Sequence, residues 1–286
     1  MEDCDFNNLK IAVVGLGLIG GSYAMALKSL NAKHIVGIDR NLATLDKAIE
    51  MNIIDCAYEK PGKFLKDIDF IIIALYPKDT IDFVKQNIKY FKSGVLITDT
   101  SGIKKIVIES VESVLPDDME FVSGHPMAGK EYKGIDYADA NIFKDANYII
   151  TPSSKNKKSS IAFIASMARK IGCKNVEYIS ADEHDKIIAY TSQLPHVIAA
   201  ALMNANLQEF KPELFVGGSF RDATRVALIN SKLWSELFML NSDKLVDTIN
   251  GFQKVLDRIK NDVLNKDVED LETVFEKSIN LRKRFK

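Results

Sequence analysis

Short apolar runs alternate with amphipathic stretches through the first 180 residues of the chain. Runs such as Ile11–Val14 and Phe70–Ala74 contain no charged side chain, and stretches with helical spacing follow them, as at Leu42–Met51 and Asp79–Tyr90. Unbroken apolar runs are typical of strands buried on both faces of a parallel sheet. The alternation predicts an α/β fold, a doubly wound parallel sheet with helices on both faces. Further strands are predicted at His34–Asp39, Cys56–Ala57, Gly94–Asp99, Phe121–Gly124, Tyr148–Thr151 and Val176–Ile179, and a further helix at Lys105–Val114.

The second part of the chain has a different pattern, with no predicted strand. Ile187–Leu202 and Lys232–Val263 show the apolar spacing of helices. We therefore predict two domains, an α/β domain at residues 1–180 and an all-α domain at residues 181–286. The stretch Ile187–Leu207 is apolar nearly all round, so this helix must be buried on most sides. A small helical domain cannot bury it alone, which predicts a homodimer formed through the helical domain.

A glycine-rich turn joins the first predicted strand to the first predicted helix. Its sequence is Gly15-Leu16-Gly17-Leu18-Ile19-Gly20, and this strand–turn–helix context is the one that the dinucleotide fingerprint requires. Gly15 permits the tight turn, Gly17 permits close approach to a pyrophosphate, and Gly20 permits close packing of helix on strand. The N–H groups at the helix start, including those of Leu18 and Ile19, then face the phosphates.

An acidic residue completes this fingerprint. Asp39 ends the second predicted strand and follows Gly20 by 19 residues, close to the spacing of about 20 in dinucleotide-binding folds. A carboxylate at this place accepts the ribose hydroxyls and repels a 2′-phosphate, which favours NAD. Arg40 could hold a 2′-phosphate, so NADP stays open as the less favoured cofactor. We assign Thr100, in a loop at another strand end, to the same cofactor site.

Composition excludes several classes of function. The net charge is −1 and charged residues make up 27% of the chain, so no global attraction to nucleic acid or an anionic membrane is expected. No apolar run approaches the roughly 20 residues of a membrane span. The three cysteines are far apart, and no metal-binding motif occurs. We expect a cytoplasmic protein without a metal site.

Three histidines and two arginines are candidates for chemistry. His125 follows a predicted strand end, and its pKa near neutrality suits a general base. We interpret His184, in the sequence Asp-Glu-His-Asp, as a helix-capping residue rather than part of the site. His196 opens an apolar helix, either as a core residue or as a donor to a ligand. Arg221 and Arg225 are one helical turn apart, and arginine is suited to bidentate recognition of a carboxylate.

Five motifs in order resemble the prephenate dehydrogenase family. They are VVGLGLIGGS, SGHPMAGKEYKG, ADEHDKIIAYTSQLPHVIA, GGSFRDATR and LINSKLW, and the likeness covers about residues 9–280. The resemblance implies a Rossmann-type domain followed by an all-α dimerisation domain like the C-terminal domain of 6-phosphogluconate dehydrogenase. It implies oxidative decarboxylation of prephenate by NAD to 4-hydroxyphenylpyruvate in tyrosine biosynthesis, with tyrosine as an expected feedback inhibitor.

The resemblance also implies roles for individual residues. His125 matches the catalytic histidine that binds the ring C4 hydroxyl, and His196 matches a second histidine of the site. Arg225 matches the arginine that anchors a substrate carboxylate. Glu131 matches a glutamate near the site entrance, and Trp234 matches a tryptophan near the substrate.

Two positions depart from the family pattern. The family serine that shares the C4 hydroxyl with the histidine falls on Gly102, so either Ser101 substitutes for it or His125 acts alone. Gln193 stands where the family commonly has histidine; it keeps hydrogen-bonding capacity for the substrate but carries no charge.

Three alternatives remain open. Arogenate dehydrogenase would act on the same ring with an amino group in place of the keto group. A hydroxy-acid dehydrogenase of the 6-phosphogluconate type would use Lys186, although the motif around that lysine is absent. A non-catalytic NAD-binding module that senses redox state belongs to a different class of protein.

Overall fold

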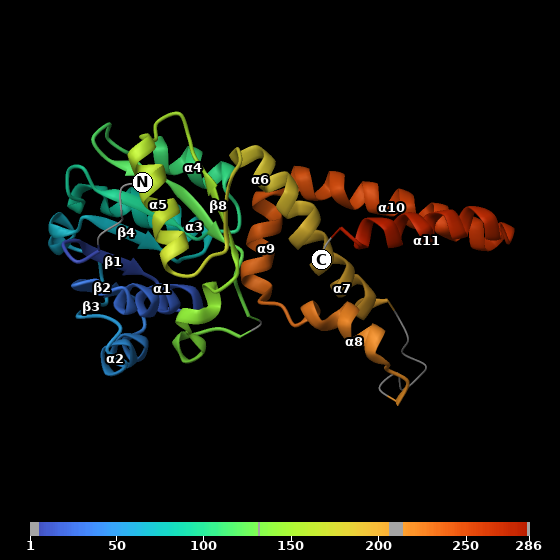
Figure 1. Ribbon diagram of the computed structural model, residues 1–286, viewed down its shortest axis with the longest axis horizontal. Helices are drawn as coiled ribbons and strands as arrows, with labels where there is room; N and C mark the ends of the chain where they lie inside the picture. The colour runs from blue at the N-terminus through green and yellow to red at the C-terminus, as the bar shows by residue number, and fades with distance from the viewer. Residues whose placement is uncertain (1–5, 131, 206–213, 285–286) are drawn as a thin grey trace.

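The computed structural model describes residues 6–130, 132–205 and 214–284, and the first part of the chain is built on a parallel sheet (Figure 1). Six strands pair in the order β3-β2-β1-β4-β5-β6. This is the strand order of the doubly wound dinucleotide-binding fold, as predicted. The strands are β1 (Lys10–Val14), β2 (His34–Ile38), β3 (Cys56–Tyr58), β4 (Phe70–Ile73), β5 (Leu96–Asp99) and β6 (Glu120–Phe121).

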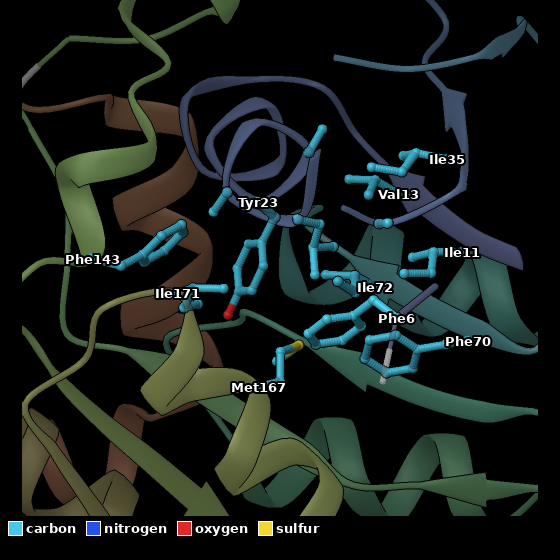
Figure 2. Close-up of a cluster of buried hydrophobic side chains, with 14 of the residues drawn as sticks. Phe6, Ile11, Val13, Tyr23, Ile35, Phe70, Ile72, Phe143, Met167 and Ile171 are labelled. Carbon is cyan, nitrogen blue, oxygen red and sulfur yellow. The ribbon is translucent and has the colours of Figure 1, made fainter. Parts of the chain in front are cut away.

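Helices cover both faces of this sheet, which explains why its strands are apolar throughout. Side chains alternate between the faces of a strand, so Ile11 and Val13 enter one cluster while Ala12 and Val14 enter the other. The first cluster also contains Tyr23 (Figure 2). Helices α1 (Leu18–Ser29), α2 (Leu42–Glu50) and α5 (Lys158–Lys170) contribute to the first cluster, and α3 (Pro77–Asn87) and α4 (Lys105–Glu112) contribute to the second.

Helix α3 starts earlier than the sequence pattern predicts. It begins at Pro77 rather than near Asp79. Proline suits the first helical position because its missing N–H would have no partner there and its φ is already helical. The 3₁₀ helices of this part are η1 (Lys63–Asp67), η2 (Ile88–Tyr90), η3 (Ile135–Tyr137) and η4 (Ala140–Phe143).

The strand predicted at Phe121–Gly124 is wrong, because the chain changes sheets at Val122. Strand β6 ends the six-stranded sheet, and the next strand starts a second sheet in the order β7-β8-β9. The pairing of β7 with β8 is antiparallel, and that of β8 with β9 is parallel. The three strands are β7 (Ser123–Pro126), β8 (Asn147–Thr151) and β9 (Asn175–Tyr178).

A buried carboxylate at the end of β5 explains this change of sheet. Asp99 accepts hydrogen bonds from the Ser123 hydroxyl at 2.6 Å and the Gly124 N–H at 3.2 Å. These bonds hold the start of β7 beside the end of β5. They are made by the Asp99 side chain and not by backbone pairing within the first sheet. His125 therefore lies within a strand, not on the loop that the sequence predicts.

Helices alone follow β9 in the described residues. A π-helical turn, η5 (Ala189–Gln193), joins the first two helices into one long rod. Helix α11 returns alongside α10, and this pair projects from the body of the molecule (Figure 1). The helices are α6 (Ala181–Ile188), α7 (Leu194–Asn204), α8 (Gly218–Thr224), α9 (Ser231–Leu240), α10 (Ser242–Asn265) and α11 (Val268–Arg282), with the 3₁₀ helix η7 (Arg225–Ala227) after α8.

The helical part leaves large apolar side chains exposed. Leu264 of α10 is 68% exposed and Phe275 of α11 is 51% exposed, while Met203 of α7 is 53% exposed. The far end of the stretch that the sequence predicts as buried, including Leu207, lies outside the described residues. Across the ranges that the structure describes, no helix combines the length and apolar character needed to span a membrane.

The glycine turn between β1 and α1 is closely packed at two of its three glycines. Gly15 has a φ of +84°, in the region that favours glycine, and a Cβ at Gly20 would lie 1.8 Å from the Gly15 carbonyl oxygen. A Cβ at Gly17 would meet no atom within 4 Å. Protein atoms thus pack closely around Gly15 and Gly20, whereas the space beside Gly17 is open.

We predict that one of two alanine substitutions in this turn reduces stability and that the other leaves it unchanged. Gly20→Ala forces backbone apart and should reduce the free energy of unfolding by about 1–3 kcal/mol or more. Gly17→Ala should leave the thermal midpoint within about 1 °C of the parent, because the added methyl group meets open space. Thermal unfolding followed by circular dichroism measures both, and equal midpoints for the two variants would contradict this description of the turn.

Candidate active site

The residues of the dinucleotide fingerprint meet at the carboxyl edge of the first sheet. The Asp39 carboxylate accepts the Leu16 N–H at 2.8 Å and the Asn41 N–H at 2.9 Å. These two bonds hold the carboxylate against the glycine turn, while Arg40 beside it is exposed. The open approach at Gly17 and the fixed carboxylate together fit the pyrophosphate and ribose of a dinucleotide.

The other predicted cofactor residues flank this turn. Leu18 and Ile19 are partly exposed on the first turn of α1, where N–H groups have no partner within the helix. The N–H of Thr100 donates to the Ile73 carbonyl at 3.1 Å, which fixes the start of the loop after β5.

A buried ion pair lies below the loop after β5. The Lys104 ammonium is 3.0 Å from both Asp99 oxygens and 2.5 Å from the Gly124 carbonyl oxygen, and both side chains are fully buried. Burial lowers the pKa of Lys104, and attraction to Asp99 opposes that shift. Removing one partner of such a pair typically costs about 3–5 kcal/mol, because the other charge stays buried and unpaired. The pair therefore fixes Gly124 and, through it, the neighbouring His125.

His125 is the first member of a hydrogen-bonded chain that crosses between the two parts of the protein. Its Nδ1 is 2.9 Å from Nε2 of His184, and Nδ1 of His184 is 2.8 Å from Oδ1 of Asp185. Asp185 also accepts the backbone N–H groups of Lys104 and Lys105 at 2.8 and 3.0 Å. The chain thus links β7 to α6 and to the start of α4.

The interpretation of His184 as a capping residue is wrong. Ser180 caps α6, its hydroxyl accepting the Glu183 N–H while the Glu183 carboxylate accepts the Ser180 N–H. His184 is fully buried one position later. A signal for this role was available in the sequence: Ser180 and Glu183 form a capping box, which leaves the histidine free for another role.

The chain of hydrogen bonds fixes the tautomer of both histidines. The Asp185 carboxylate acts as an acceptor only, since it already accepts two backbone N–H groups. The contact with His184 must therefore carry the Nδ1 proton of the histidine. Neutral His184 then presents a bare Nε2, which accepts the Nδ1 proton of His125. The lone pair of His125 is consequently on Nε2, the atom that can take a proton from a substrate.

The surroundings keep His125 neutral. Burial lowers its pKa well below the usual value, and electrostatic interactions with His184 and with the Lys104 ammonium add to this effect. Burial also lowers the pKa of His184, and the hydrogen bond that His184 donates to the Asp185 carboxylate opposes this shift. A neutral imidazole with an accepting Nε2 has the properties of a general base.

Space for a small side chain exists beside this imidazole. A Cβ at Gly102 would lie 4.0 Å from Cε1 of His125 and 3.6 Å from the Leu237 side chain, both ordinary contact distances. Ser101 is 3% exposed, and among the described residues its hydroxyl has no hydrogen-bond partner. Gly102 is thus the position next to the base, and Ser101 holds an unused hydroxyl one residue away.

His196 of α7 and Trp234 of α9, both predicted site residues, lie against each other. Their rings stack with centroids 3.5 Å apart. Nδ1 of His196 donates to the Ser192 carbonyl at 2.8 Å, and burial lowers the pKa of the ring. A neutral His196 therefore presents an acceptor at Nε2. This differs from the donor role, one of the two interpretations that the sequence leaves open for His196, since donation requires a proton on Nε2.

Three other predicted residues lie in different settings. Gln193 is 1% exposed; its amide donates to the Leu237 carbonyl and accepts from Asn241, so it joins helices instead of offering the substrate contact that we expected. Arg225 begins η7, which packs against α7, the helix that carries His196. Glu131 lies outside the described residues.

Comparison with known families identifies both parts of the chain. Residues 23–177 match the model of the prephenate dehydrogenase nucleotide-binding domain, and residues 180–277 match that of the prephenate dehydrogenase dimerization domain. A prephenate dehydrogenase of Bacillus subtilis (strain 168) is 31% identical over 281 residues, covering 95% of this chain and 75% of that protein.

Solved structures extend the similarity to the whole fold. Prephenate dehydrogenase from A. aeolicus, in complex with hydroxyphenyl propionate and NAD+, is 27% identical with a TM-score of 0.90, covering 97% of this chain and 98% of that one. Synechocystis arogenate dehydrogenase is 26% identical with a TM-score of 0.84, covering 97% and 100%. Because both parts match the family's models and a relative matches over nearly the full length, the chain belongs to the prephenate dehydrogenase family of NAD-dependent oxidoreductases.

Proposed function

We propose that this protein catalyses the oxidative decarboxylation of prephenate to 4-hydroxyphenylpyruvate with NAD, in the cytoplasm. The observation that carries the proposal is the hydrogen-bonded chain His125–His184–Asp185, which leaves Nε2 of His125 as an acceptor at the carboxyl edge of the sheet. We also propose the division at residue 180, with an α/β domain that holds the cofactor and an all-α domain that contributes to the substrate site.

The glycine turn and Asp39 would hold NAD, and NAD when bound supplies the hydride acceptor. Gly17 allows the pyrophosphate to approach backbone N–H groups at the start of α1. Asp39 keeps lone pairs for the ribose hydroxyls after binding the Leu16 and Asn41 N–H groups. Its negative charge opposes a 2′-phosphate, so we propose NAD rather than NADP as the working cofactor, despite the exposed Arg40.

His125 performs the proton transfer in this proposal. Its Nε2 takes the proton of the C4 hydroxyl as the C4 hydride leaves, so C4 becomes a carbonyl carbon. The bond between the ring and its carboxylate then breaks, carbon dioxide leaves, and the electron pair makes the ring aromatic. The C4 oxygen takes the proton back from Nε2 of His125, which gives the product hydroxyl and restores the base. While His125 is protonated, His184 and Asp185 stabilise the imidazolium through the Nδ1 hydrogen bonds. A positioned general base typically contributes about 10²–10⁴-fold to the rate.

The remaining residues would orient the substrate. Arg225 would bind one carboxylate as a bidentate partner. His196 would approach the other end of the dianion, whose negative charge favours a proton on the ring, and Trp234 stacked on it would limit its movement. We keep Ser101 as a partner for the C4 hydroxyl because its hydroxyl is unused, and Glu131 at the entrance rests on the family resemblance alone.

The first experiment compares substrates and cofactors with the purified protein. We expect NADH formation with prephenate to exceed that with arogenate, and NAD to exceed NADP, when absorbance at 340 nm is followed. Activity with arogenate alone would be compatible with the fold and with His125 as the base, but it would make arogenate the substrate. The similarity to Synechocystis arogenate dehydrogenase is the reason for testing this compound. Binding of NAD without turnover of either compound would overturn the proposal in favour of a non-catalytic module. Added tyrosine tests feedback inhibition in the same assay.

Catalysis should be lost in acid as His125 takes a proton. The pKa of His125 is lowered, so kcat/KM should be level above pH 6.5 and fall only below it, as the base form disappears. His125→Asn should reduce kcat by about 10²–10⁴-fold and remove this acid limb. Initial rates from pH 5 to 9 measure both, and a variant that retains the wild-type rate would exclude His125 as the base.

Two controls separate this effect from unfolding and from substrate binding. A buried histidine with a lowered pKa binds fewer protons in the folded state than in the unfolded chain, so stability also decreases as pH falls below about 6.5. Thermal midpoints at each pH show whether the enzyme is still folded where activity is lost. Arg225→Ala should chiefly raise KM for prephenate, whereas His125→Asn should leave NAD affinity unchanged.

We propose that two copies associate through the helical part and cover its exposed apolar side chains. Sedimentation equilibrium at micromolar concentration should give about twice the 32.0 kDa mass of one chain. Phe275→Asp or Leu264→Asp should shift the equilibrium to monomers, while Lys85→Asp on the exposed side of α3 should not. A wild-type protein that sediments as one chain would contradict the proposal.

A further inference from the structure

Helix α9 connects the substrate side of the site to the α/β part through its polar residues. It lies between the first sheet and helices α6 and α7 (Figure 1). The Glu236 carboxylate accepts the Lys78 N–H at 2.8 Å, and the Asn230 amide donates to the Tyr76 hydroxyl at 2.7 Å. Both contacts join α9 to the start of α3, more than 150 residues earlier in the chain.

Helix α3 needs this contact because it has no cap of its own. Its N-cap residue is Tyr76, whose side chain makes no capping hydrogen bond. The first N–H groups of a helix lack partners within the helix, and a carboxylate there is favoured by the helix dipole. Glu236 therefore acts as the N-terminal cap of α3 from the other part of the protein.

Helix α4 has the same arrangement. Its N-cap residue is Lys104, which also makes no side-chain cap, and Asp185 of α6 accepts the N–H groups there. The two Rossmann helices that follow β4 and β5 thus receive their caps from carboxylates of the helical part. Asp185 belongs to the proton-transfer chain of His125, whereas Glu236 has no part in that chemistry.

The position of α9 controls what surrounds the substrate. Two residues before Glu236, Trp234 stacks on His196. One residue after it, the Leu237 side chain approaches Gly102, beside His125. The C-terminal end of α9 is separately anchored, because Gln193 donates to the Leu237 carbonyl and binds Asn241. Loss of the Glu236 contact would therefore loosen mainly the half of α9 that carries Trp234, which would still be joined to α3 by the hydrogen bond from Asn230 to Tyr76.

We propose that Glu236 is a positioning residue, which caps α3 and thereby holds Trp234 against His196 at the substrate site. The catalytic consequence rests on the proposed function, but the positioning itself does not. Since the base is held by β7 and α6, loss of Glu236 should disturb substrate binding more than proton transfer. Glutamine keeps a carbonyl oxygen at the same place, so it should retain most of the cap.

The test compares Glu236→Ala, Glu236→Gln and the control Ser235→Ala, an exposed neighbour on the same helix. Trp234 is the only tryptophan, so its emission reports on α9 without any substrate. We expect a red-shifted emission and stronger acrylamide quenching for Glu236→Ala. We expect kcat/KM for prephenate to fall about 10- to 100-fold in this variant, mainly through KM. Glu236→Gln should restore both readings to within about threefold of wild type, and Ser235→Ala should match wild type.

Two results would overturn the proposal. One is wild-type emission and quenching in Glu236→Ala, whatever its thermal midpoint. The other is a glutamine variant as disturbed as the alanine variant in emission and KM. If wild-type protein does not oxidise prephenate, the proposed function fails, and the emission and quenching readings still decide whether Glu236 positions Trp234.

Discussion

The ion pair between Asp99 and Lys104 is the constraint on which the site depends. Two fully buried charges are tolerated only when their remaining donors and acceptors are also satisfied. Asp99 therefore binds Ser101, Ser123 and the Gly124 N–H, and Lys104 binds the Gly124 carbonyl. These bonds determine where β7 begins and place the base above a positive charge. Burial is the main reason why the pKa of His125 is lowered, and the Lys104 ammonium of this pair adds to the effect.

The candidate active site draws on both parts of the chain. His125 comes from the second sheet, but the groups that fix its tautomer come from α6. Asp185 also accepts the N–H groups at the start of α4. The contacts that orient His125 therefore also hold the helical part against the α/β part. A change that separated the two parts would leave His125 with an unpaired Nδ1 proton and no defined tautomer.

Local sequence predicts the first sheet well and the site only in part. The apolar runs and the glycine turn reflect contacts between near neighbours, and Asp39 lies where the spacing from Gly20 places it. The change of sheet after Phe121 depends on Asp99, more than 20 residues away, so the run Phe121–Gly124 gives no sign of it. The contacts of His184 and Gln193 depend on partners 59 and 44 residues away, so the capping box at Ser180 excludes a capping role for His184 without showing that it binds His125.

The π-helical turn between α6 and α7 sets the rotation of His196 relative to His184. Pro195 lacks the N–H of a regular helix and clashes with the preceding turn, and the chain accommodates it by widening at Ala189–Gln193. Twelve positions at about 100° each would place the two histidines about 120° apart around a regular helix. One residue absorbed by the wide turn would reduce this difference to about 20°. The irregular turn thus changes the angle between two histidines on one continuous rod, of which His184 contacts His125 and His196 stacks on Trp234.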